Sequence, residues 1–346
     1  MHSMLASMFA GLLAWTIELW WLDRLTVIML SITMAVLGIA YLVGSLIKRQ
    51  PDSTINPAVV QAFNMRVRAW WLMFVILTTA FLLGPTATVV LFFLVSFWAL
   101  REFITLTPTR KADHMTLFWV FMFSPVQYLL IAQGSEFYGL YSIVIPVYIY
   151  LFIPARIAMA GDYKRFLERA AKIQAGILIC VYALSYAPAL LYLDYQTSGG
   201  GGAEAAAWTG SRAGVLFYLI LIVQIGDVTQ YIWSRYAGRR IIAPEINASR
   251  TWEGFFGGVL TTSLVGSVLH IMTPFNAWEA AFVAMVTAVM GFAGGMTMSA
   301  IKRDRGVKDY GTLVEGHAGI LDRVDSLCFA APVFFHLTRF WFTKLV

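Results

Sequence analysis

The segment from Ser299 to Asp325 holds most of the side chains in this sequence whose types and spacing could support chemistry. It places four aspartates and five lysines or arginines between two strongly apolar segments. Carboxylates can bind a divalent metal ion, and the cations between them can bind the oxygens of a polyphosphate. The alternative is a solvated loop whose positive charge only fixes membrane topology.

The spacing within this segment favours the chemical interpretation. Asp322 and Asp325 are three residues apart, so on a helix they would share one face while Arg323 points away from it. Gly319 and two glycines before it are positions where backbone N–H groups could approach a phosphate without a Cβ atom in the way. We therefore expect the segment to bind phosphate groups.

Two motifs carry a resemblance to a known family. The first consists of Ser299, Lys302-Arg303, Lys308-Asp309, His317-Ala318-Gly319 and Asp322-Arg323-Val324-Asp325. The second consists of Asp227, Gln230, Tyr231, Pro244 and the run Ser249-Arg250-Thr251-Trp252-Glu253-Gly254. Together they resemble the signature of the phosphatidate cytidylyltransferases, also called CDP-diacylglycerol synthases. The match is firm over roughly residues 215–330 and only general, as apolar helices, before that.

Four positions depart from the pattern that the family usually shows. Ala318 replaces the second glycine after the histidine, and Glu315 replaces a proline or glycine. Arg250 replaces a lysine, and Gln230 replaces an alanine. No candidate metal ligand is lost by these changes. The sequence thus resembles a divergent subgroup of the family, and the departures leave its lipid substrate open.

The resemblance implies a reaction between CTP and phosphatidic acid that needs Mg²⁺, and a monovalent cation such as K⁺ also accompanies the family. Asp322 and Asp325 are the first candidates for metal ligands, followed by Asp309. Asp227 is the fourth, because an acidic side chain at the end of an apolar span needs a partner. The candidate catalytic residues are Asp309, Asp322, Asp325, Lys308 and His317. The candidate substrate-binding residues are Ser299, Lys302, Arg303, Arg323, Arg250, Thr251, Glu253 and Gly319.

Several of these residues also have structural interpretations. His317 is expected to bind or position phosphate rather than act as a base, because a proton on the attacking phosphate is no obstacle at neutral pH; its alternative is a loop histidine bonded to backbone. Thr251 could cap the next helix, with Glu253 in the first turn. Ser299 and Lys302 are three residues apart, but no acyl-transfer constellation accompanies them, so we reject a serine nucleophile.

Composition indicates an all-α, polytopic integral membrane protein. Hydrophobic residues make up 59% of the 346 residues and charged residues only 13%, against about 25% charged in soluble domains. Runs long enough to cross about 30 Å of hydrocarbon predict about ten spans. In that count 69–84 and 86–100 are a short pair that could be tilted or re-entrant around Gly84. The runs are 5–22, 25–47, 69–84, 86–100, 115–133, 137–158, 172–193, 212–233, 254–273, 276–298 and 326–343.

The distribution of cations predicts the orientation. With a cytoplasmic N-terminus, 21 of the 25 lysines and arginines fall on the cytoplasmic side, leaving Arg24, Arg212, Arg339 and Lys344 outside. This orientation places both motifs on the cytoplasmic face, where CTP is present, and favours a bacterial inner-membrane protein. Topology and anionic membrane lipids then explain the net charge of +6, so nucleic acid is not an expected partner.

The chain divides into two predicted parts. Residues 1–200 are expected to form an N-terminal transmembrane scaffold, beginning with a retained span, and residues 201–346 a catalytic region with the signature at 299–325. Cys180 and Cys328 lie inside apolar runs, which indicates buried thiols rather than a disulfide or a metal site. The sequence leaves the oligomeric state open, a homodimer included.

Two alternatives remain at this point. A CTP transferase acting on another lipid phosphate, such as an isoprenoid ether lipid, would carry the same charges. A transporter, or a non-catalytic protein that binds lipids with its basic face, belongs to a different class. Transport would predict polar residues in the middle of several spans, and outside Glu18 and Asp227 these are scarce.

Overall fold

The chain folds as a bundle of helices, seen here in a computed structural model. The structure describes residues 22–47, 57–107, 109–197, 207–307, 309–310 and 319–343. Within these ranges the only β-type pairing consists of three isolated bridges. The all-α prediction is therefore confirmed. The apolar run predicted at 5–22 lies outside the described residues.

The first helices are long, and a single residue connects two of them. α2 (Arg24–Ile47) and α3 (Pro57–Leu83) pack side by side, and Gly84 turns the chain into α4 (Pro85–Leu106). Gly84 has a φ of 107°, a conformation that favours glycine, and Pro85 occupies the first turn of α4, where no N–H is needed. Both α3 and α4 contain a full-length span, so the runs at 69–84 and 86–100 are two complete helices rather than a short pair.

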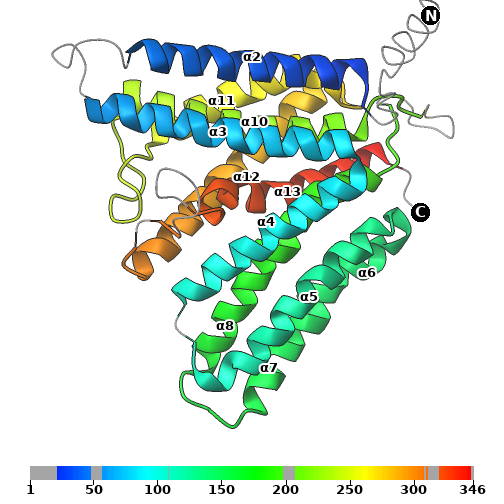
Figure 1. Ribbon diagram of the computed structural model, residues 1–346, viewed down its shortest axis with the longest axis vertical. Coiled ribbons are helices and arrows are strands. Elements are labelled where there is room, and N and C mark those ends of the chain that lie inside the picture. The colour runs from blue at the N-terminus through cyan, green and yellow to red at the C-terminus, as the bar shows by residue number, and fades with distance from the viewer. Residues whose placement is uncertain are drawn as a thin grey trace, which may run out of the picture.

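The next helices project as an arm at the bottom of Figure 1. The arm begins with η1 (Lys111–Asp113) and α5 (His114–Ala132). One rod follows as η2 (Ser135–Phe137), α6 (Tyr138–Ile143), η3 (Val144–Ile149) and α7 (Tyr150–Ala158). A second rod consists of α8 (Phe166–Ile177), η4 (Leu178–Ala183), α9 (Leu184–Ala189) and η5 (Leu190–Tyr192). η3 and η4 are π-helical turns that continue each rod instead of ending it.

The remaining helices pack on one another as a second group. They are α10 (Arg212–Tyr236), α11 (Trp252–Val268) with η6 (Leu269–Met272), α12 (Ala277–Asp304) and α13 (Leu321–Phe342). Ser211, Thr251 and Asn276 cap the starts of α10, α11 and α12 by accepting backbone N–H groups of the first turn. α13 also packs against α4 and α9, so one hydrophobic core joins this group to the N-terminal helices.

Nine helices among the described residues are long and apolar enough to cross a membrane. This number agrees with the prediction of about ten spans and supports an integral membrane protein. α13, which contains the apolar run predicted at 326–343, falls outside this set. Its first turns carry Asp322, Arg323 and Asp325, which lower its apolar character.

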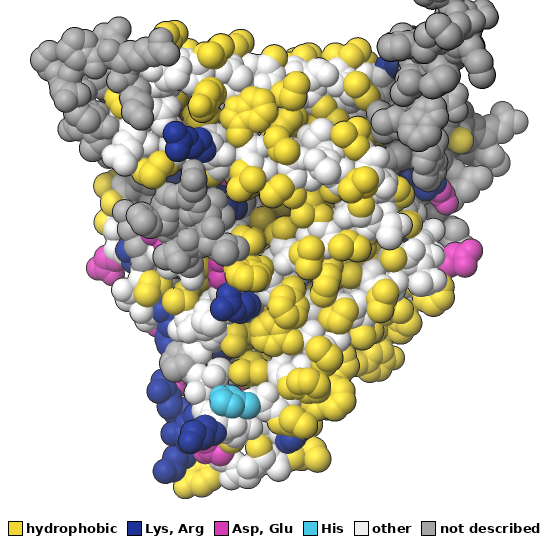
Figure 2. All heavy atoms as spheres, in the orientation of Figure 1, with side chains coloured by type: hydrophobic (Ala, Val, Ile, Leu, Met, Phe, Trp, Pro, Cys, Tyr) yellow, Lys and Arg dark blue, Asp and Glu magenta, His cyan; other side chains and the backbone are white. Residues whose placement is uncertain are grey.

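Charged side chains gather at one end of the molecule. Figure 2 shows Lys and Arg along the left edge of a face that is otherwise mostly hydrophobic. The C-terminal end of α4 meets the start of α13 at this end, as the hydrogen bonds from Ile320 and Leu321 to Glu102 demonstrate. The arrangement matches the predicted concentration of cations on one side of the membrane.

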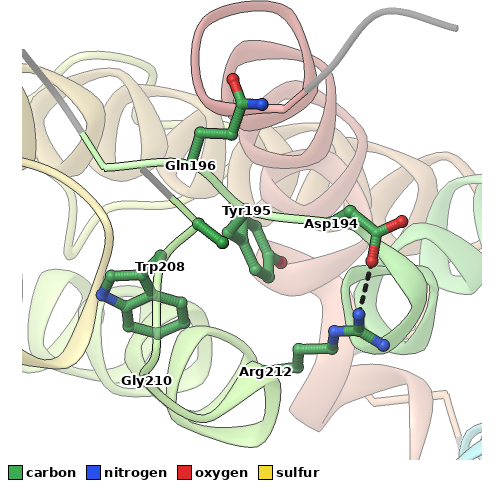
Figure 3. Close-up of a pocket in the computed structure, with 7 residues that line it drawn as sticks. Asp194, Tyr195, Gln196, Trp208, Gly210 and Arg212 are labelled. Atoms are coloured by element: carbon green, nitrogen blue, oxygen red, sulfur yellow. Dashed lines mark hydrogen bonds and ion pairs between the residues drawn. The ribbon is translucent and has the colours of Figure 1, made fainter. Parts of the chain in front are cut away.

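A cavity of about 380 Å³ lies at the opposite end, where α10 begins (Figure 3). Asp194 pairs there with Arg212, and the rings of Tyr195 and Trp208 meet edge to face with centroids 5.6 Å apart. The backbone N–H of Gln196 donates to the carbonyl of Phe342 over 2.8 Å, which fastens this segment to the end of α13. None of the motif residues lines the cavity, so it does not mark the candidate site.

Candidate active site

The two sequence motifs meet where α10, α12 and α13 approach one another. Asp227 comes from α10, Arg250 from the loop before α11, Lys302 from α12, and Asp322 and Asp325 from the first turns of α13. Three carboxylates thus face two cations that contact them or act on their charge. This gathering of carboxylates makes the cluster the candidate for a metal site.

Asp322 organises the segment that leads into α13. Its Oδ1 accepts a hydrogen bond from Lys302 Nζ over 2.8 Å, and its Oδ2 accepts from the backbone N–H groups of Tyr310 at 2.8 Å and Gly319 at 3.0 Å. The carboxylate is only 8% exposed. Since a carboxylate offers about four acceptor positions, three are already used by the protein.

Tyr310 also holds this arrangement in place through its side chain. Its hydroxyl donates to the carbonyl of Met298 over 3.1 Å, and Lys302 Nζ lies 5.4 Å from the centre of its ring. Burial raises the pKa of Tyr310, so the hydroxyl remains protonated and keeps donating over the physiological range. The ring therefore fixes the side chain of Lys302 beside Asp322.

Arg250 reaches from its loop to α10 and bonds two side chains of that helix. Its Nη2 lies 3.1 Å from Asp227 Oδ1, and its Nη1 lies 2.8 Å from Gln230 Oε1. The Asp227 side chain keeps 30% of its surface exposed and that of Arg250 keeps 18%. Arg250 and Gln230 are two of the positions that depart from the family pattern, and here they are direct partners.

Asp325 lies deeper on the same helix face. Its Oδ1 accepts from the backbone N–H of Ser326 over 2.7 Å. The charges of Asp227, Lys302 and Asp322 all act on it across the site. Because Asp227 and Asp325 repel one another, their proximity is costly unless a cation lies between them.

Glycines of α12 allow α13 to come this close. A Cβ on Gly294 would lie 2.8 Å from the backbone carbonyl oxygen of Asp325, and one on Gly295 would lie 3.6 Å from Arg250 Nη2. Small residues at such positions let helix backbones approach each other directly. The packing of α12 on α13 therefore sets how far Asp325 lies from Arg250.

The loop between α10 and α11 is fastened to α12 by the remaining motif residues. Asn247 Nδ2 lies 3.4 Å from Ser299 Oγ, and Arg303 Nε donates to the carbonyl of Ile246 over 3.2 Å. Ser299 and Arg303 were predicted to bind substrate, and in this conformation they contact the loop that carries Arg250. Arg303 is exposed, so it still faces solvent beside the site.

Thr251 and Glu253 hold the other end of this loop. Thr251 Oγ1 accepts from the N–H of Gly254 over 3.1 Å and donates to Ser234 Oγ over 3.2 Å. The structural interpretation of Thr251 as the cap of α11 is therefore confirmed. Glu253 accepts the backbone N–H groups of Arg239 and Arg240 at 3.0 and 3.1 Å, which fixes the turn after α10.

Other predicted residues lie at the edge of the described site or beyond it. Asp309 is exposed and adjoins Tyr310, and Arg323 is partly buried in the first turn of α13. Lys308 and His317 lie outside the described residues, and so do Glu315 and Ala318, so the roles suggested for them stay predictions. Sequence reasoning missed Glu102 of α4, which accepts two backbone N–H groups at the start of α13.

The donor set suits Mg²⁺ without forming a complete cage. Among the residues that the structure describes, no three acidic, histidine or cysteine side chains lie together as ligands for one ion. Mg²⁺ usually needs only one or two protein carboxylates, with waters and substrate phosphates completing its shell. Asp325 and Asp227, which the protein leaves less engaged than Asp322, fit that requirement best.

These features describe an integral membrane protein of helices, in which acidic and basic side chains of the two motifs meet at one end of the bundle. The sequence profile of the cytidylyltransferase family matches residues 64–341. The chain belongs to this family, whose members are nucleotidyltransferases. The match begins in α3 and therefore includes most of the N-terminal helices as well as the two motifs.

Individual relatives fall into two kinds. The uncharacterized protein YnbB of Escherichia coli K12 is 35% identical over 279 residues, which cover 80% of this chain and 87% of the relative. A phosphatidate cytidylyltransferase of Staphylococcus epidermidis is 38% identical over 120 residues, covering 34% of this chain and 46% of the relative. One from Haemophilus influenzae is 32% identical over 126 residues, covering 35% and 44%. The alignments to these two enzymes span less than half of either enzyme's length.

Proposed function

We propose that this protein transfers the cytidylyl group of CTP to phosphatidic acid, giving CDP-diacylglycerol and pyrophosphate. The observation that carries the proposal is the convergence of Asp227, Arg250, Lys302, Asp322 and Asp325, which come from both family motifs, at one end of the bundle. The similarity to phosphatidate cytidylyltransferases over 120 residues supports the choice of lipid.

The reaction joins two anionic reactants. A phosphate oxygen of the lipid attacks the α-phosphorus of CTP, a new P–O bond forms, and the bond between that phosphorus and the bridging oxygen to the β-phosphate breaks. Pyrophosphate leaves with the electron pair. The lipid phosphate is already ionised near neutral pH, so the chemistry does not demand a strong base, and His317 remains a candidate for positioning phosphate.

Cations of the site would hold the reactants against their mutual repulsion. Arg250 presents a planar guanidinium between α10 and α12, a geometry suited to bidentate phosphate contacts. Lys302 contributes a point charge beside Asp322, and exposed Arg303 faces solvent nearby. Lys308, Arg323 and Gly319 remain further candidates for phosphate contacts.

Mg²⁺ would be held by Asp325 and Asp227, with Asp322 and Asp309 as the next candidates, and when bound it would neutralise charge on the phosphate oxygens. This order differs from the sequence-based one, because Asp322 already accepts hydrogen bonds from Lys302, Tyr310 and Gly319. A role for K⁺ rests on the family resemblance and stays a prediction.

The decisive experiment is an assay of the purified protein in detergent with labelled CTP, Mg²⁺ and phosphatidic acid, following CDP-lipid and pyrophosphate together. A panel of lipid phosphates, including an isoprenoid ether lipid phosphate, tests the lipid choice. Preference for another member of the panel would replace phosphatidic acid as the substrate. No product with any of them would favour a non-catalytic lipid-binding protein or a transporter.

We further propose that the site faces the cytoplasm of a bacterial inner membrane. Lys164 lies in the loop before α8 at the end that carries the site, and exposed Asp194 lies at the other end. A cysteine at Lys164 should be labelled only from the cytoplasmic side and one at Asp194 only from outside. The native thiols of Cys180 and Cys328 are buried and give little background. The reverse pattern would separate the site from CTP.

A further inference from the structure

Glu102 reaches the site from a helix that the motifs do not include. It lies near the C-terminal end of α4, only 5% exposed, and its neighbours in space belong to the start of α13. Its Oε1 accepts the backbone N–H of Ile320 over 3.0 Å, and its Oε2 accepts that of Leu321 over 2.9 Å. The carboxylate therefore caps a helix that begins more than two hundred residues later in the chain.

The start of a helix leaves several backbone N–H groups without partners inside the helix. Here Glu102 takes those of Ile320 and Leu321, and Asp322 takes that of Gly319. Two carboxylates thus occupy the part of α13 where a phosphate would otherwise be favoured. In this conformation the N-terminus of α13 is an anchored structural element rather than an open anion site.

Gly319 provides the space for this contact. A Cβ atom there would lie 2.4 Å from Glu102 Oε2 and 2.8 Å from Glu102 Cδ. No side chain fits at this position while Glu102 keeps its place. The glycine of the motif therefore has a packing reason that does not depend on a substrate.

We propose that Glu102 is a positioning residue for the transfer reaction. By bonding both Ile320 and Leu321, it fixes the height and rotation of the first turn of α13, and with it the directions of Asp322 and Asp325. The N-terminal helices thereby determine where the carboxylates of the signature lie. This proposal deepens the proposed function and rests on it for its effect on turnover.

Both oxygens of Glu102 accept hydrogen bonds. A substitution can therefore remove its charge and one acceptor without changing the size of the side chain. Glu102→Gln keeps the shape but offers one acceptor and turns an N–H donor toward one of the two backbone donors. Gly319→Ala disturbs the same contact from the α13 side. Asp113→Asn is the matched control, because Asp113 is a buried carboxylate of the N-terminal helices that bonds Arg169 and does not contact α13.

The first measurement is hydrogen–deuterium exchange of peptides covering residues 319–325 in the intact protein in detergent. Glu102→Gln and Gly319→Ala should each speed exchange at Ile320 and Leu321 by at least about tenfold, the effect expected when a hydrogen bond to a charged group is lost. Asp113→Asn should leave that region unchanged while lowering the midpoint of thermal unfolding.

The second measurement is the cytidylyl-transfer assay. Glu102→Gln should lower kcat by at least about tenfold, an effect of the same size as the hydrogen-bond loss, with a smaller change in KM for CTP. Asp113→Asn should change neither once rates are referred to folded protein.

Unchanged exchange at Ile320 and Leu321 in both variants would overturn the proposal. It would also be overturned if Asp113→Asn lost as much kcat as Glu102→Gln for the same decrease in thermal stability. If the wild-type protein transfers no cytidylyl group to any lipid phosphate, the proposed function fails, and exchange still decides whether Glu102 anchors α13. Should Glu102→Gln not fold, Gly319→Ala carries the same test.

Discussion

Two ion pairs near the same end of this molecule differ in what surrounds them. In the arm, Asp113 of η1 and Arg169 of α8 are 0% and 5% exposed. Arg169 also donates to the carbonyls of Asp162 and Lys164, and Asp113 accepts the N–H of Arg110. In the candidate site, Asp227 and Arg250 remain 30% and 18% exposed, and the charge of Asp227 acts on Asp325 of α13, which also feels that of Asp322.

The difference separates a structural ion pair from the site to which we assign the proposed function. The arm's pair satisfies its charges and hydrogen-bonding groups within the protein, so adding a ligand would gain nothing. The candidate site gathers three carboxylates around Arg250 and Lys302, and the side chains of Asp227 and Arg250 stay partly exposed. Charge alone therefore does not identify function in a membrane protein, whereas a cluster of like charges with partly exposed members is a candidate for it.

The largest expected effect concerns the candidate site. Asp325→Asn removes an anionic ligand while preserving size, and cytidylyl transfer should fall by orders of magnitude, because a positioned metal supplies several kcal/mol of charge stabilisation. Rates at saturating Mg²⁺ measure the effect, and circular dichroism checks the fold. Asp304→Asn is the control, since Asp304 is exposed and pairs only with its neighbour Arg305 among the described contacts. Near-normal activity of Asp325→Asn would end the assignment.

The same substitution in Asp322 should act differently. Asp322→Asn weakens the hydrogen bonds from Tyr310, Gly319 and Lys302, so we expect lower stability together with lower activity. Thermal unfolding and turnover of the two variants distinguish a ligand from an organiser. Equal stability of Asp322→Asn and Asp325→Asn would contradict this division of roles.

Breaking the arm's pair should affect stability without affecting chemistry. Asp113→Asn removes the buried counterion of Arg169 and leaves it only Asp162, whose Oδ2 lies 3.4 Å from Arg169 Nη1, so the loss should be at most about 3–5 kcal/mol, the cost of breaking a buried pair. Unfolding in detergent should show the loss, and activity per folded molecule should be retained. Arg110→Ala, in the more exposed pair with Asp162, should have a much smaller effect. A specific loss of turnover in Asp113→Asn would make the arm part of the site.

A smaller effect is expected from the helix contact that brings the site together. Gly294→Ala places a Cβ against the backbone of Asp325 and should cost about 1–3 kcal/mol as α13 shifts away. Its activity should fall more than its stability explains. Gly139→Ala in α6 is the control, because nothing lies within 4 Å of the added atom. Full activity of Gly294→Ala would show that the spacing of α12 and α13 is not critical.

The smallest effect concerns the pair that departs from the family pattern. Arg250→Lys and Gln230→Ala should each reduce activity. The double variant should lose less activity than the two single losses added together, with a coupling free energy of about 0.5–3 kcal/mol for residues in direct contact. A double-mutant cycle on kcat/KM measures this. Strict additivity would mean that the hydrogen bond between Arg250 and Gln230 carries no weight in turnover.

Much of the fold could be predicted because apolar length and charge are local properties of the chain. Within the part of the chain that the structure describes, the helices appear where the hydrophobic runs predicted them, and Asp227, expected to have a partner at the end of its span, bonds Arg250. The convergence of the two motifs followed from the family resemblance. The mutual bond of Arg250 and Gln230 did not, because nothing local links positions in different elements.

Glu102 shows why the rest could not be predicted. It follows Arg101 at the end of an apolar run, so from the sequence it is interpreted as one of the charged residues at the membrane boundary. The rule that a buried acidic residue needs a partner was a usable signal, but the partners are backbone N–H groups that any sequence offers. Sequence reasoning predicted a phosphate near Gly319, which stays a prediction, but it gave no sign that the Glu102 carboxylate would pack against this glycine.

The marginal apolar character of α13 has a consequence for how the protein enters the membrane. This helix begins with three charged residues, which oppose insertion of an isolated segment. Lys302, the counterion of Asp322, and Glu102, the cap of α13, belong to helices that precede it in the chain. α13 should therefore insert by docking onto helices that are already in place, so that the site is completed late in biogenesis. A chain ending before Leu321 should still integrate its earlier spans, which protease protection in membrane vesicles would measure.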